Sequence, residues 1–353
     1  MNEKEENKIL TRFITGIPKA ELHIHLEGSI EPEMMFALAE KNKVKLKFKT
    51  VEELKNAYVF QDLRDFLDIY TQGTKVLKKA EDFYEITLAY LRKSFSQNVL
   101  HAEIFIDFQT YTRRGMDPAV IMDGTTAAID AAKKELGIST YLILAFLRHL
   151  GAKSAMKTLE EALQYKSQLA GIGLASTEVG YPPHLFKEVF EKAAKYGFKT
   201  TAHAGEEGPA SYVRESIEIL KVDRIDHGNK AMDDPQLVKL LIDRQIPLTL
   251  CPLSNLALGN VPDLTKHTLK KKLDLGMLVS VNSDDPAYFG GYVNENLIAI
   301  AGALNLDYND IEKLAKNSII SSFLPEENKR ELLKKINNFT DDFYNKYQSH
   351  KTQ

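Results

Sequence analysis

The feature that most constrains the fold of this chain is a repeated alternation of short apolar strands with amphipathic helices. Eight runs have the length and apolar content of buried strands, and helical periodicity follows each of them. The expected strands are residues 22–28, 99–107, 140–148, 172–179, 198–205, 224–227, 247–251 and 278–284. No glycine-rich phosphate loop follows the first strand, as a dinucleotide-binding sheet would require. The pattern therefore predicts a (β/α)₈ barrel.

Two segments lie outside this repeat. Residues 51–97 are helical in pattern with no strand between them, which predicts a helical insertion after the first strand. Such an insertion could be a wall over a functional site or plain scaffolding. Residues 308–347 are expected to form helices that pack outside the barrel. Without an internal repeat or a linker, residues 1–353 are expected to be one domain, with the polar residues 1–8 disordered.

Composition narrows the possible partners and the compartment. Lysine and arginine total 46 against 49 acidic residues, a net charge of −3, so no basic field favours nucleic acid or an anionic membrane. A small-molecule substrate is the expected partner. Cys251 is the only cysteine, which excludes an intramolecular disulfide. The chain has no apolar run of about 20 residues and no apolar leader near its start, so we expect a soluble, cytoplasmic protein.

Polar side chains gather at the ends of the predicted strands. His23 and His25 are two residues apart, so a strand projects both imidazoles from one face. With nine histidines, a His-x-His pair is expected by chance roughly 0.2 times in this length, so the pair alone is only suggestive. Barrel active sites lie at the carboxyl ends of the strands. Later strands end close to His203, Glu206, His227, Asp284 and Asp285.

For any one of these polar side chains, a hydrogen-bonded role in the core is the simpler explanation. It does not explain well why several strands end in such residues. The remaining histidines serve as a comparison. His101 begins a strand and should lie at the opposite end of the barrel, while His184, His267 and His350 fall in helical or terminal stretches and are interpreted as structural or solvated. His149 follows the third strand at the correct end, so we expect it to line the pocket.

Three imidazoles and one carboxylate form a ligand set suited to Zn²⁺, with Fe²⁺ or Mn²⁺ less favoured. The predicted ligands are His23, His25, His203 and Asp284. A metal of this kind lowers the pKa of bound water to near 7 and so yields hydroxide at neutral pH. Glu206 could then donate a proton, His227 could deprotonate or orient the water, and Asp285 could hold the substrate. Residues 171–180 contain no lysine that could bridge a second metal, so one metal is expected.

Five motifs, at residues 18–28, 203–206, 224–228, 251–255 and 283–286, resemble the adenosine/adenine deaminase family of the amidohydrolase superfamily. The resemblance covers roughly residues 17–325 in the correct order. It implies a mononuclear zinc barrel in which hydroxide adds to C6 of a purine and ammonia leaves. It further implies that Glu206 protonates N1, that Asp285 bonds N7 and that the backbone of Gly180 approaches N3.

The choice of purine depends on Glu27, because adenosine deaminases carry an aspartate there that helps to bind ribose. Residues 176–180, 251–255 and 284–292 resemble the adenine branch, so the implied reaction converts adenine to hypoxanthine. Glu27, Phe289 and Tyr292 could fill the volume that a ribose needs, although the two aromatic residues could also merely pack their loop. Tyr181 stands where many relatives have histidine, so the resemblance does not decide which base or which N6-substituent the site accepts.

Three alternatives remain at this stage. The same machinery could deaminate adenosine or N6-substituted adenines, or the chain could be a catalytically silent purine-binding protein. Deamination of polynucleotides is excluded by the single cysteine, because those enzymes use a Pro-Cys-x-x-Cys zinc site. A homo-oligomer is possible, but no sequence feature selects its surface.

Overall fold

Eight parallel strands form the centre of the molecule in the order β1 to β8, each paired with the next in the sequence. The computed structural model describes residues 3–60 and 63–348. The strands are β1 (Lys19–His25), β2 (Val99–Asp107), β3 (Ser139–Leu147), β4 (Gly171–Ala175), β5 (Lys199–Ala204), β6 (Arg224–His227), β7 (Leu248–Leu250) and β8 (Val279–Val281). The predicted (β/α)₈ barrel is thus confirmed.

The seam between β8 and β1 closes the sheet into a barrel just beyond the end of β8. The amide of Asp284 donates to the carbonyl of His23 at 3.0 Å, and the amide of His25 donates to the carbonyl of Asp284 at 2.9 Å. The side chain of Asn282 accepts from the amide of Leu22 at 2.8 Å. These bonds satisfy edge groups that an open sheet would leave exposed.

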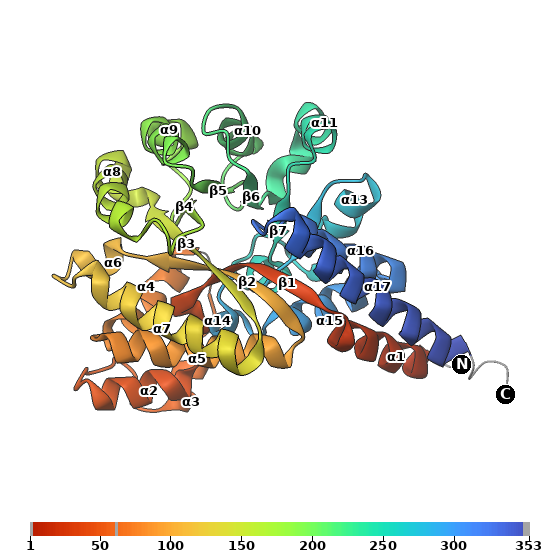
Figure 1. The fold of residues 1–353 in the computed structure, drawn as a ribbon, viewed down its shortest axis with the longest axis horizontal. Coiled ribbons are helices and arrows are strands. Elements are labelled where there is room, and N and C mark those ends of the chain that lie inside the picture. Colours follow the sequence, from red (N-terminus) through yellow and green to blue (C-terminus); the bar gives the residue numbers. More distant parts are fainter. Residues whose placement is uncertain (1–2, 61–62, 349–353) are drawn as a thin grey trace.

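Helices surround the strands, as Figure 1 shows for α8, α9, α10, α11 and α13. The longer helices are α1 (Glu3–Gly16), α2 (Pro32–Lys41), α4 (Leu63–Gly73), α5 (Ala80–Ser96), α7 (Pro118–Leu136), α8 (Gly151–Ala162), α9 (Lys187–Lys195), α10 (Ala210–Glu218), α11 (Pro235–Arg244), α15 (Val293–Leu304), α16 (Tyr308–Ile320) and α17 (Glu326–Gln348). Shorter ones are α3 (Val51–Asn56), α6 (Gln109–Thr112), α12 (Pro252–Ala257), α13 (Leu269–Asp274) and α14 (Pro286–Phe289).

Several helices begin where local chemistry predicts. Pro118 and Pro235 occupy the first helical turn of α7 and α11, where a missing N–H costs nothing. Asp117 and Asp234 cap the same two helices by accepting bonds from backbone amides of the first turn. Gly137 ends α7 in the left-handed conformation, at φ 75°.

The fourth strand is shorter than its apolar run suggests. It was expected over residues 172–179 but ends at Ala175. Ser176 and Gly180 adopt φ values of 75° and 89°, which no strand accommodates. Residues 176–180 therefore form a loop at the carboxyl end of β4.

Among the described residues, the predicted helical insertion contains α3, α4 and α5, and the last two have different roles. Several residues of α4, among them Phe66 and Tyr70, line the pocket described below, so this helix is a wall of the site. Helix α5 instead packs along α7 on the outside of the barrel (Figure 1). The insertion thus serves both as a wall and as scaffolding.

The expected disorder of residues 1–8 is wrong for residues 3–8, which begin helix α1. This helix buries Phe13 and Ile14 completely, and the ring of Phe13 lies 5.6 Å from that of Phe339 in α17. Figure 1 shows α1 beside α17. The apolar face of α1 finds a partner more than 300 residues later in the chain, which the polarity of its first residues did not reveal.

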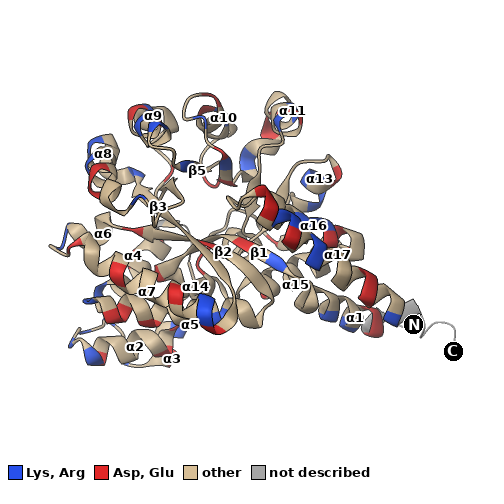
Figure 2. Cartoon of the chain, in the orientation of Figure 1, with Lys and Arg blue, Asp and Glu red and all other residues tan. Residues whose placement is uncertain are grey.

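Charged residues of both signs are interspersed over the outer helices in the view of Figure 2. This distribution agrees with the balanced composition and forms no single-sign face in that view. Among residues 3–60 and 63–348, no helix combines the length and the apolar character that crossing a membrane would require.

Candidate metal centre and substrate pocket

Four side chains from three distant parts of the chain converge at the carboxyl ends of the strands. The Nε2 atoms of His23 and His25 each lie 3.1 Å from Nε2 of His203. Asp284 Oδ1 lies 3.4 Å from His23 Nε2 and 3.5 Å from His25 Nε2. Each residue thus offers one ligand atom, and all four atoms lie within 4.8 Å of one another. The predicted ligand set is brought together.

The tautomers of two of these histidines indicate that a cation belongs between them. Thr249 donates its hydroxyl proton to Asp226 at 3.0 Å, so the His23 Nδ1 that lies 3.0 Å from this hydroxyl must be the donor. His203 Nδ1 lies 3.3 Å from the other oxygen of Asp226 and also faces an acceptor. In the neutral rings both Nε2 atoms therefore present lone pairs to each other at 3.1 Å, an arrangement that repels unless a proton or a metal cation lies between them.

The spacing suits four ligand atoms that share one metal ion. Ligand atoms about 2.0–2.1 Å from a common ion lie roughly 3 to 4 Å apart, a range that includes the observed spacings of 3.1 to 3.5 Å. Burial lowers the pKa of His25 to about 3, so this imidazole is neutral and free to ligate at neutral pH. The residues present thus fit a divalent metal.

The ligands are themselves held by buried polar groups. Asp226 contacts both Thr249 and His203, and Thr201 donates to it at 2.7 Å. Ser254 donates to the second oxygen of Asp284 at 2.7 Å. Such partners fix ring orientation and ligand basicity at metal sites.

Two residues of the site adopt a backbone conformation that non-glycine residues rarely use. His227 has φ 66° and Asp284 has φ 63°. Left-handed conformations cost about 1 kcal/mol or more and cluster at functional sites. Both residues follow or end a strand, and the turn aims each side chain at the ligand cluster.

Glu206 and His227 lie beside the ligand cluster, as predicted. His227 Nε2 is 3.5 Å from Glu206 Oε2 and 3.8 Å from Asp284 Oδ2. Burial, together with the charges of Asp284 and Glu178, raises the pKa of Glu206 well above its ordinary value. Burial and the neighbouring His23 lower the pKa of His227 well below its ordinary value. Both shifts favour the uncharged forms, a protonated acid beside a neutral base.

Asp285 lines the pocket and carries a buried carboxyl oxygen, Oδ1, that has no hydrogen-bond partner among the described residues. Burial beside Asp284 raises the pKa of Asp285 well above the ordinary value. A Cβ atom on Gly28 would lie 2.0 Å from this oxygen and 2.6 Å from Cα of Asp285. Because Gly28 has no side chain, Asp285 can occupy this space.

Glu27 is buried and held by two tyrosines that sequence reasoning did not find. The Tyr111 hydroxyl donates to its Oε1 at 2.9 Å and the Tyr70 hydroxyl to its Oε2 at 3.4 Å. Burial and the nearby Asp107 raise the pKa of Glu27 to about 8.

Of the two aromatic residues expected to fill the ribose volume, Phe289 lines the pocket, whereas the Tyr292 hydroxyl donates to Glu31 at 2.7 Å.

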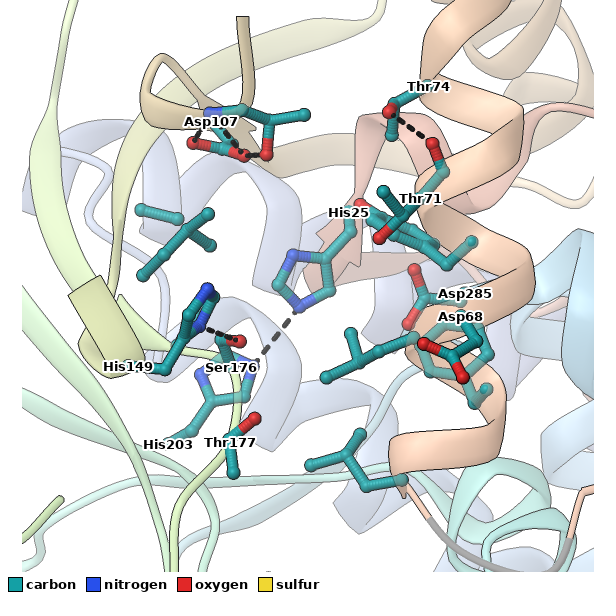
Figure 3. A pocket seen from close by; sticks show the side chains of 18 of the residues that line it. His25, Asp68, Thr71, Thr74, Asp107, His149, Ser176, Thr177, His203 and Asp285 are labelled. Carbon is teal, nitrogen blue, oxygen red and sulfur yellow. Dashed lines mark hydrogen bonds between the residues drawn. The ribbon is translucent and has the colours of Figure 1, made fainter. Parts of the chain in front are cut away.

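The cluster lies at the bottom of a pocket of about 840 Å³. Figure 3 shows His25 and His203 facing each other, with Asp285 nearby and residues of α4 on one side. His149 lines the pocket as expected, and its Nδ1 lies 2.8 Å from the Ser176 hydroxyl. Gly180 lies between Val179 and Tyr181, which both line the pocket.

The other histidines behave largely as interpreted. His101 is buried between Ser139 and Glu103, His184 pairs with Glu215, and His267 contacts Asn255. His350 lies outside the described residues. Asp107, in contrast, lines the pocket although it was not predicted. It ends β2, so the strand-end rule that identified the other residues would have found it.

A barrel that gathers three imidazoles and a carboxylate beside a buried acid, all at the carboxyl ends of its strands, is the architecture of the amidohydrolase class. The family model for adenosine deaminase matches residues 18–339. The chain belongs to this adenosine deaminase family, as its motifs predicted.

Individual relatives agree with this assignment. An adenine deaminase of Crocosphaera subtropica is 54% identical over 320 residues, which cover 91% of this chain and 98% of the relative. An adenine deaminase of Acinetobacter baylyi is 49% identical over 93% of this chain and 98% of its own length.

Solved structures show the same fold. The crystal structure of adenine deaminase from Arthrobacter aurescens superposes with a TM-score of 0.91 at 44% identity, covering 92% of this chain and all of the other. An amidohydrolase from Burkholderia ambifaria with bound Zn gives a TM-score of 0.86 at 25% identity, covering 95% of each chain.

Proposed function

We propose that this protein is an adenine deaminase, which hydrolyses adenine to hypoxanthine and ammonia. The observation that carries the reaction type is the placement of Glu206 and His227 3.5 Å apart beside the ligand cluster. Hydrolytic deamination needs a proton donor for the ring, an acceptor for the proton of water and a means to activate that water.

We propose Zn²⁺ as the metal, held by His23, His25, His203 and Asp284. This mixture of imidazole nitrogens with one carboxylate oxygen is a ligand set that zinc favours, and the related amidohydrolase of Burkholderia ambifaria contains Zn. When bound, the ion would supply Lewis-acid activation of water at neutral pH.

Glu206 donates a proton to N1 of the purine, and burial beside Asp284, which raises the pKa of the carboxyl group, favours the protonated form that this step needs. Protonation of N1 makes C6 more electrophilic, so water adds there. His227, kept neutral by burial, accepts a proton from the attacking water through Nε2. The amino group at C6 takes up the proton held by His227 and leaves as ammonia, while the C6 hydroxyl returns a proton to Glu206 and becomes the carbonyl of hypoxanthine.

Asp285 orients the purine. Its carboxyl group lines the pocket beside the ligand cluster and can form a hydrogen bond with N7. The backbone of Gly180 approaches N3 from the loop after β4. Both contacts place C6 against the cluster.

Glu27 selects the free base. Its carboxyl group lies just after β1, in the short 3₁₀ helix Leu26–Ser29, and is fixed by Tyr111 and by Tyr70, which lines the pocket. A ribose would have to displace this group and leave buried polar atoms unpaired, which costs about 1–3 kcal/mol for each group. The relatives that share about half of this sequence are named adenine deaminase.

The test is a comparison of adenine, adenosine and N6-methyladenine as substrates for zinc-loaded protein, with ammonia release as the readout. Adenine should have the highest kcat/KM. Adenosine is the second candidate, because a pocket of about 840 Å³ holds more than a two-ring base. Faster turnover of adenosine would overturn the proposal, and no release from any aminopurine would identify a silent purine-binding protein.

A further inference from the structure

We propose that Glu178 is a positioning residue for Glu206: its carboxylate fixes the backbone of residues 205–208 and thereby sets the place of the proton donor. The inference builds on the proposed deaminase function. Glu178 follows β4, whereas Glu206 follows β5, so the contact joins two adjacent strand-end loops.

The contact consists of four bonds from successive backbone amides to one carboxylate. Oε1 accepts from the amide of Gly205 at 2.6 Å. Oε2 accepts from the amides of Glu206, Glu207 and Gly208 at 3.0, 3.0 and 2.8 Å. Consecutive amides that face one point form a concave anion site, and bonds to a charged acceptor are roughly twice as strong as neutral ones.

The surroundings make this arrangement rigid. Glu178 is fully buried, and the left-handed Gly205 turns the chain so that its amide faces the carboxylate. A Cβ on Gly208 would lie 2.6 Å from Cδ of Glu178, so the loop approaches the carboxylate as closely as only glycine permits. The backbone on both sides of Glu206 is therefore held by a side chain that does not itself line the pocket.

Arg148 donates hydrogen bonds to backbone carbonyls on both sides of the contact between the loops after β4 and β5. Its Nη1 donates to the carbonyl of His203 at 2.8 Å, and its Nε donates to the carbonyl of Tyr181, in the loop of Glu178, at 2.9 Å. A buried cation thus holds the end of β5 while a buried anion holds the loop that follows. Arg148 therefore acts on His203, a predicted metal ligand, and Glu178 acts on Glu206, the proposed acid, three residues further along the chain.

This arrangement separates positioning from metal binding. The side chain of His203 points to the ligand cluster, where its Nδ1 faces Asp226, and Arg148 donates to its backbone carbonyl. The hydrogen bonds to Glu178, in contrast, come from the amides of residues 205–208. Loss of Glu178 should therefore release Glu206 while the metal site remains. A displacement of about 1 Å in a reacting group costs up to about a hundredfold in rate.

The experiment compares wild-type protein with Glu178→Gln, whose amide places an N–H₂ group against backbone donors. We expect kcat for adenine to fall about 10- to 100-fold with KM changed less than about threefold and with the metal content per subunit unchanged. The amides of residues 205–208 should exchange hydrogen faster than in wild-type protein. Unchanged kcat in this variant would overturn the inference.

A control variant, Asp82→Asn, tests whether the role of Glu178 is merely structural. Asp82 is also a buried carboxylate that accepts from two backbone amides, those of Lys78 and Lys79, but it lies outside the pocket. Asp82→Asn should lower the unfolding temperature and leave kcat and exchange at residues 205–208 unchanged. If it lowers kcat as much as Glu178→Gln does, the effect is one of general stability and the inference is wrong.

A double mutant tests whether Glu178 acts through Glu206. Glu178→Gln added to Glu206→Gln should lower kcat no further, because the group that it positions is already disabled. A multiplicative loss would contradict the inference.

Should Glu178→Gln fail to fold, Gly208→Ala replaces it, since the added methyl group displaces the same carboxylate. The same loss of kcat is expected, and a normal kcat would overturn the inference.

Absence of adenine turnover in wild-type protein refutes the proposed function instead. In that case hydrogen exchange at residues 205–208 still decides the positioning role, with faster exchange in the variant supporting it and unchanged exchange refuting it.

Discussion

The amide of Asp284 donates to the carbonyl of His23 at 3.0 Å, and this bond both closes the barrel and assembles the ligand set. The two residues are separated by 261 positions in the chain, yet the parallel bridge between Ile24 and Asp284 fixes their side chains at one rim. The metal centre is therefore built at the seam of the sheet.

Asp284→Ala should lose both the metal and the activity, because three imidazoles remain without the carboxylate that balances the charge of the ion. Metal content after dialysis is the measurement. Asp68→Asn is the control, since Asp68 is an exposed carboxylate of the same pocket and should keep the metal. A full metal complement in Asp284→Ala would place the fourth ligand elsewhere.

Glu206→Gln should retain the metal and lower kcat by about 10²- to 10⁴-fold, the usual contribution of a general acid. The amide has nearly the same shape but no acidic proton to give to N1. Steady-state kinetics with adenine, together with metal analysis of the same sample, measure the effect. Near-normal turnover would show that another group supplies the proton.

Gly28→Ala should reduce activity and stability together, because its methyl group would overlap the side chain and backbone of Asp285. Gly302→Ala in α15 is the matched control, since a Cβ there meets nothing within 4 Å. In a helix interior this change stabilises by about 0.5–1 kcal/mol. Thermal unfolding and kcat/KM of both variants are the measurements, and equal behaviour of the two would refute the close approach.

Glu27→Asp should raise the ratio of adenosine to adenine turnover, because the shorter side chain vacates volume beside Tyr111. A change of about tenfold corresponds to roughly 1.4 kcal/mol of discrimination. Tyr292→Phe, whose hydroxyl bonds to Glu31 outside the pocket, should leave the ratio unchanged. Should Glu27→Asp leave the ratio unchanged as well, Glu27 does not select the base.

Stability should depend on pH through Lys272, which is fully buried in α13. Burial lowers the pKa of its ammonium group from 10.5 to about 7. Between these two values the unfolded chain binds a proton that the folded protein does not, so the free energy of unfolding rises with pH. Below pH 7 the lysine is charged in both states and the full cost of its burial remains.

Lys272→Met should remove this dependence. The difference in unfolding free energy between wild-type and variant protein should change by an amount on the order of a few kcal/mol between pH 7 and pH 10.5, in favour of wild type at the higher pH. Denaturant unfolding at several pH values measures it. A difference that is independent of pH would mean that Lys272 keeps an ordinary pKa in the fold.

The sequence by itself determined the barrel and the ligand set, because both depend on local periodicity. Alternation places His23 and His25 on one face, and parallel strands carry their carboxyl ends to one rim, so residues that end strands must meet there. This reasoning needs no knowledge of which helix packs where.

The tertiary structure alone decided which side chains support these residues. Tyr111 reaches Glu27 across 84 positions, and Glu178 reaches the backbone beside Glu206 from another strand. Neither contact has a periodic signal, because each depends on how loops of irregular backbone approach one another in space. The docking of α1 on α17 was hidden for the same reason: burial of an apolar helix face is settled by a partner far along the chain.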